Sequence, residues 1–88
     1  IPDLLKVDVE GGELNVLMGA RNLILEHRPI WYLEIEHYHT ERFGYEPKDI
    51  FEFLFSYGYD AYQMDLDGKL TRVSGYVNPI DYLFIARA

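Results

Sequence analysis

The 88-residue sequence contains no cysteine, so it can form neither a disulfide nor a thiolate metal site. It also lacks any apolar run long enough to cross a bilayer, and no signal-peptide pattern stands at its start. Basic residues are few, with 8 Lys and Arg against 15 Asp and Glu, and a net charge of −7 disfavours contact with nucleic acid. These absences predict a cytoplasmic protein that binds neither nucleic acid nor membrane.

What the sequence does contain is typical of a folded unit. Hydrophobic residues make up 49% of it and aromatic residues 16%, which is enough for one small core. The first residues are Ile1 and Pro2, with no initiator Met before them. We therefore expect residues 1–88 to be a single partial domain that belongs to a longer chain.

Strands and helices are predicted to alternate along the chain. Apolar alternation predicts strands, and apolar residues at helical spacing followed by Pro or Gly predict helices. The expected elements are a strand over 4–10, a helix over 13–28, a strand over 30–37, a polar stretch through Gly44, a helix over 47–57, strands over 60–65 and 82–86, and an Asp-Gly hairpin turn within 66–70. Strands joined by helices favour an α/β fold with a mostly parallel sheet, closed by an antiparallel strand.

Acidic residues stand where the first two strands end. Asp8 and Glu10 close the first strand, and Glu36 and His37 close the second. In an open parallel sheet, ligands bind outside the carboxyl ends of the strands. If the two strands are neighbours, about 4.8 Å apart, these side chains converge on one rim. We therefore predict Asp8, Glu10, Glu36 and His37 as catalytic residues.

The glycine pair that follows, Gly11 and Gly12, permits a sharp turn and leaves room for a ligand against the backbone. Simpler explanations stay open for the whole segment. Acids before a helix are favourable through the helix dipole, a glycine pair is ordinary turn chemistry, and Lys6 is a potential partner of Asp8. The "HYH" segment over 37–39 offers two imidazoles on one strand face but no third ligand, so no metal site is predicted.

One stretch resembles a known family. "LLKVDVEGGELNVLMGARNLI" (4–24), followed by "YLEIEH", "FGYEPKDIFEFLFSYGY" and "YLFIARA", is similar to the FkbM-type methyltransferases over essentially the whole chain. The shared elements are "DVEG", a Glu two residues later, "VL" and "GA". Two features depart from the family pattern: a second glycine after "DVEG", and "EIEH" where the family often shows Glu, Ile or Val, then His.

The resemblance implies the second half of a seven-stranded Rossmann-like methyltransferase sheet, namely strands four to seven. It also implies an S-adenosylmethionine-dependent enzyme that methylates a hydroxyl group of a sugar or natural product. By the motif, Asp8 and Gly11 would lie next to the cofactor, and Glu10, Glu36 and His37 would act as base or orient the acceptor. The main cofactor-binding half is not in this sequence, so we expect the isolated 88 residues to be inactive.

Two other functions remain open at this stage. One is a metal-dependent hydrolase or lyase that uses the strand-end acids with His37 or His39 as ligands. The other is a non-catalytic acidic α/β interaction module. A half-sheet leaves its first strand unpaired along one edge, so we also expect either self-association through that edge or further residues before Ile1 that cover it.

Overall fold

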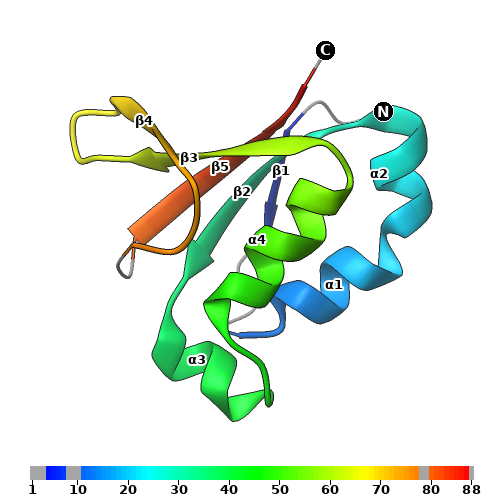
Figure 1. Ribbon diagram of the computed structural model, residues 1–88, viewed down its shortest axis with the longest axis horizontal. Coiled ribbons are helices and arrows are strands. Elements are labelled where there is room, and N and C mark those ends of the chain that lie inside the picture. Colours follow the sequence, from blue (N-terminus) through cyan, green and yellow to red (C-terminus); the bar gives the residue numbers. More distant parts are fainter. Residues whose placement is uncertain (1–3, 8–10, 78–79, 88) are drawn as a thin grey trace.

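The computed structural model describes residues 4–7, 11–77 and 80–87, which form one mixed α/β layer structure (Figure 1). Their elements are β1 (Leu4–Val7), α1 (Glu13–Gly19), α2 (Arg21–His27), β2 (Ile30–Ile35), α3 (His37–Arg42), α4 (Pro47–Ser56), β3 (Tyr59–Met64), β4 (Leu70–Val73) and β5 (Ile80–Ala86). Among these described residues, no helix is both long and apolar enough to span a membrane.

The five strands form one sheet in the order β1-β2-β5-β3-β4. Among the strands that the structure describes, only β1 and β2 pair in parallel, and the other three pairings are antiparallel. The prediction of a mostly parallel sheet is therefore wrong. The physical reason is that β5 lies between β2 and β3 and runs against both, so that β1, β2 and β3 share a direction without β2 and β3 touching.

The core lies between one face of the sheet and the helices α1, α2 and α4, which Figure 1 shows on the same side of the sheet. Along β2 the side chains alternate, so that Trp31, Leu33 and Ile35 are buried while Glu34 is exposed. The buried core residues are Leu17, Ile24, Trp31, Leu33, Ile35, Ile50, Phe51, Leu54, Tyr59, Ala61, Tyr82 and Phe84. Five of these twelve are aromatic, so large rings supply much of the core.

The other face of the sheet carries more polar contacts. There the Tyr32 hydroxyl donates a 2.6 Å hydrogen bond to Asp81 Oδ2, across the β2–β5 pair. This bond, with partial burial and the negative charges of Asp81 and Glu34, raises the pKa of Tyr32 to about 12. Lys6, considered above as a partner of Asp8, places its Nζ atom 5.4 Å from the centre of the Tyr32 ring.

The helix predicted over 13–28 is two helices. Ala20 separates them with φ −98° and ψ 19°, which lies outside the helical range, although its N–H still bonds to the carbonyl of Val16. Leu17 and Ile24 are buried as expected from the apolar spacing, but Val16 is 39% exposed. The buried stripe runs instead through Leu14, which is partly buried, and Leu17.

The second half of the chain follows the sequence signals closely. Pro47 begins α4, and Asp49 Oδ2 accepts a 2.9 Å hydrogen bond from the N–H of Glu46 at the helix start. The turn between β3 and β4 is closed by Asp65, whose Oδ1 atom accepts bonds from the N–H groups of Asp67 and Lys69. The hairpin and the interior position of the last strand are thus confirmed. The polar stretch before Gly44, for which the sequence predicts no helix, contains α3.

Candidate functional site

The carboxyl ends of β1 and β2 lie side by side, because the two strands pair in parallel with Val7 opposite Leu33. Asp8 and Glu10, two of the predicted catalytic residues, lie outside the described residues. Val7, before them in the sequence, pairs with Leu33 of β2, and Gly11, after them, lies against α3.

Gly11 lies directly against α3. Its φ of +108° is unfavourable for residues that have a Cβ atom, and such an atom here would lie 2.4 Å from the backbone oxygen of His39 and 2.8 Å from Phe43 Cδ1. The glycine at this position is thus required by the close approach of the turn to α3. Its predicted role in cofactor binding is a separate matter and stays a prediction.

Two side chains hold this turn in place. Glu13, only 1% exposed, accepts a 3.0 Å hydrogen bond at Oε1 from the N–H of Gly11. The Tyr45 hydroxyl, from the segment between α3 and α4, donates a 2.5 Å bond to the Gly11 carbonyl. It also lies 3.4 Å from the N–H of Leu14. Burial raises the pKa of Tyr45 above its ordinary value of 10.0, so this hydroxyl keeps its proton in neutral solution.

Glu36 and His37 mark the junction between β2 and α3. β2 ends at Ile35, and Glu36 has extended backbone. His37 is the first residue of α3, and the side chain of His37 lies outside the part that the structure describes. Glu36 Oε2 lies 3.2 Å from His39 Nε2, and the two side chains are 35% and 23% exposed. The carboxylate at the end of β2 is thus paired with His39.

This Glu36–His39 pair was not predicted from the sequence. The sequence places "HYH" in a predicted strand, in which alternate residues share a face. In a helix, residues three apart are neighbours, and a helical interpretation of "EHYH" would have placed Glu36 beside His39. Gly11 also lies next to the Glu36–His39 pair, because it contacts the backbone of His39.

A small pocket of about 300 Å³ opens between α3 and the start of α4. Glu41, Gly44, Tyr45 and Glu46 line it, and Tyr45 connects it to the Gly11 turn. Two carboxylates and a phenol suit a polar, hydroxylated or cationic group better than an anion. The pocket is therefore acidic, as is Glu36 after the end of β2.

Comparison with protein families identifies the chain. A family model described as the methyltransferase FkbM domain matches residues 1–61. The chain belongs to the FkbM methyltransferase domain family. The match contains every residue of the Gly11 turn, the Glu36–His39 pair and α4, so the resemblance drawn from "DVEG" and "LEIEH" is confirmed. Neither the curated proteins nor the solved structures compared with the chain gave a match.

The metal interpretation of the FkbM domain's histidines loses its geometric basis. It assumed that residues 37 and 39 share a strand face, and the segment is helical. In the ranges 4–7, 11–77 and 80–87, no three His, Cys, Asp or Glu side chains come close enough together to hold a metal ion. What the described rim does offer is a partly exposed carboxylate, Glu36, with an imidazole beside it.

Proposed function

We propose that this FkbM domain is part of an S-adenosylmethionine-dependent O-methyltransferase that acts on a hydroxyl group of a sugar or natural product. The observation that carries the proposal is the packing of the Gly11 turn against α3. This packing puts Gly11, which follows Asp8 and Glu10 in the sequence, beside the backbone of His39, the residue that pairs with Glu36. Membership of a methyltransferase family supplies the reaction class.

The chemistry of the rim suits this reaction. The cofactor, when bound, supplies a methyl group activated by a positively charged sulfur. A carboxylate attracts such a cation, and Asp8 is the residue we assign next to it, together with Gly11. The remaining part of the cofactor site is proposed to lie in the other half of a Rossmann-like sheet.

The acceptor hydroxyl must lose its proton as its oxygen bonds to the methyl carbon. We assign this proton to the Glu36 carboxylate, which is partly exposed and lies at the strand end. His39, 3.2 Å away through Nε2, holds the carboxylate in place and is a positioning residue. Proton transfer to a positioned base typically contributes about 10²–10⁴-fold to the rate. Glu10 and His37 are assigned to orienting the acceptor.

The test uses the full-length protein with methyl-labelled S-adenosylmethionine and a panel of hydroxylated acceptors. Glu36→Gln should lower kcat by about 10²-fold or more while the fold is kept. Glu34→Gln is the matched control, because Glu34 lies on β2 two residues before Glu36 and is exposed. It should stay within a few-fold of wild type. Full activity in Glu36→Gln, or equal losses in both variants, would remove Glu36 from the mechanism.

Two further assignments accompany this function. The isolated residues 1–88 should transfer no methyl group, and turnover by them alone would contradict the proposed division of the active site.

We also propose a cytoplasmic protein that can self-associate through β1. β1 is an edge strand of the described sheet, and Leu4 on it is 55% exposed. Sedimentation velocity of the chain with and without Leu4→Lys would test this, since a charged edge should shift it to monomer.

A further inference from the structure

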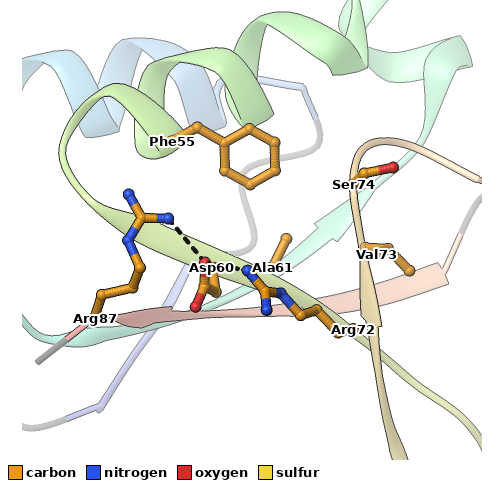
Figure 2. Close-up of a pocket in the computed structure, with 7 residues that line it drawn as sticks. All are labelled: Phe55, Asp60, Ala61, Arg72, Val73, Ser74 and Arg87. Carbon is orange, nitrogen blue, oxygen red and sulfur yellow. Dashed lines mark hydrogen bonds and ion pairs between the residues drawn. The ribbon is translucent and has the colours of Figure 1, made fainter.

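A second, larger pocket lies far from the acidic rim. Its volume is about 520 Å³, and it opens between α4 and the strands β3 and β4, beside the end of β5 (Figure 2). Ala61 in its lining pairs with Phe84, which also pairs with Trp31 near the start of β2. Glu36, which follows β2 with extended backbone, is five residues after Trp31, roughly 17 Å at the rise of a strand. The pocket is therefore at the opposite end of the sheet.

Two arginines and one aspartate form the charged side of this pocket. Asp60 Oδ1 accepts a 2.9 Å bond from Arg87 Nη1 and a 3.1 Å bond from Arg72 Nη2 (Figure 2). Within the part of the chain that the structure describes, this is the one side-chain hydrogen bond of each guanidinium. Since each guanidinium has five N–H donors, both retain donors that can face the pocket.

The charges of this cluster do not cancel. One carboxylate balances only one of the two guanidinium groups, which leaves a net charge of about +1 at the pocket. Asp60 is 17% exposed on its side chain, against 67% for Arg72 and 53% for Arg87, so the positive groups are the ones that face solvent. Such a site is unusual on a chain with a net charge of −7. Exposed ion pairs add little to stability, so folding alone gives a weak reason for it.

The remaining walls are apolar or neutral. Phe55 projects from α4 over Asp60 and Ala61, and Ser74 lies on the far side of the pocket (Figure 2). The Phe55 ring is held by Phe51, with the two ring centres 6.0 Å apart in an edge-to-face arrangement. An aromatic wall opposite two guanidinium groups suits a ligand that has a flat apolar body and an anionic end. The volume is within the range of small-molecule sites.

We propose that this pocket binds a small organic anion, with Arg72 and Arg87 holding its carboxylate or phosphate and Phe55 covering its apolar part. The site is separate from the acidic rim and does not depend on the methyl-transfer assignment. Asp60 sets the affinity, because it orients both guanidinium groups and also competes with the ligand for them.

The experiment is a titration of the ¹⁵N-labelled full chain, followed by NMR, with four probes: phenyl phosphate, benzoate, inorganic phosphate and benzyl alcohol. Phenyl phosphate and benzoate should give saturable shifts at Phe55, Arg72 and Arg87, and their relative affinities distinguish a phosphate site from a carboxylate site. Inorganic phosphate should bind more weakly, and benzyl alcohol should not bind. An absence of saturable shifts with both aromatic anions at millimolar concentration would overturn the proposal.

Three variants make the result specific. Arg87→Gln should weaken binding of the aromatic anions about tenfold or more, whereas Arg21→Gln, an exposed arginine on α2, should leave it unchanged. Asp60→Asn should tighten binding, because it removes the competing charge. A cluster that serves only to tie strands together predicts no gain in Asp60→Asn, and equal losses in both arginine variants would indicate unspecific attraction. Either result would contradict the assignment.

Discussion

Gly11→Ala is predicted to be among the most damaging single-methyl changes in this FkbM domain. Two costs combine at this position. A residue with a Cβ atom at a φ of +108° loses about 1–2 kcal/mol in backbone strain. The new methyl group would also lie 2.4 Å from the His39 carbonyl oxygen, a backbone atom that cannot rotate away. Overpacking of this kind costs about 1–3 kcal/mol.

The summed loss, about 2–5 kcal/mol, is large for a small domain. A chain of this size is expected to have a free energy of unfolding of about 4–13 kcal/mol. Each kcal/mol lost lowers the Tm by about 4–8 °C in a domain of this size class. Urea unfolding, followed by circular dichroism, measures the loss directly. In the Gly11→Ala protein that remains folded, the structural changes should be largest at the Gly11 turn and at α3, which contacts this turn.

Two other glycines separate the two costs. Gly44 has a φ of +78°, but a Cβ atom there meets nothing within 4 Å, so Gly44→Ala should lose only the backbone part, about 1–2 kcal/mol. Gly19 has neither the positive φ nor a neighbour within 4 Å, so Gly19→Ala should be neutral or slightly stabilising. If Gly11→Ala is no less stable than Gly44→Ala, the turn does not pack against α3 as described. The link between the Gly11 turn and the Glu36–His39 pair is then refuted.

Further predictions concern two tyrosines. Tyr45→Phe removes the hydroxyl that donates a hydrogen bond to the Gly11 carbonyl, and it should lower the free energy of unfolding by about 1 kcal/mol. Tyr62→Phe is the control and should change it negligibly, because the Tyr62 hydroxyl makes no such bond in the described structure. Equal effects of the two variants would show that Tyr45 does not stabilise the turn. Tyr32 should titrate at about 12 by ¹³C NMR of labelled rings, and nearer 10 in Asp81→Ala. Because the folded-state pKa is raised, the stability that this bond contributes is full below pH 10 and is lost between about pH 10 and 12. A Tyr32 that titrates near 10 in both proteins would show that the bond does not form.

The sequence predicted the elements better than their arrangement. Alternation in "IWYLEI" and the Pro47 and Asp49 signals are local, so β2 and α4 appear within a residue or two of where they were expected. The position of β5 between β2 and β3 depends on pairing between residues about 50 positions apart, such as Tyr32 with Leu83. Hydrophobic periodicity shows that this strand is interior but does not say which strands it joins or in which direction.

In the candidate site, too, local features were predicted from the sequence and long-range contacts were not. The acids at the strand ends and the need for a glycine after them were visible in "DVEGG". The partner of Glu36 was not, because the polar "EHYHTER" segment lacks the apolar stripe that predicts a helix, and its helix forms through backbone bonds such as Thr40 N–H to the Glu36 carbonyl. Tyr45 was likewise hidden, since its contact with Gly11 joins residues 34 positions apart.

The central claim is that the ends of β1 and β2 act as one acidic site in methyl transfer. The most direct measurement is a double-mutant cycle on kcat in the full-length protein, with Asp8→Asn, Glu36→Gln and the two combined. The account predicts a large loss in each single variant and a double variant little slower than the slower single one, since residues that act as a unit are strongly non-additive. Wild-type kcat in either single variant, or losses that simply multiply, would contradict it.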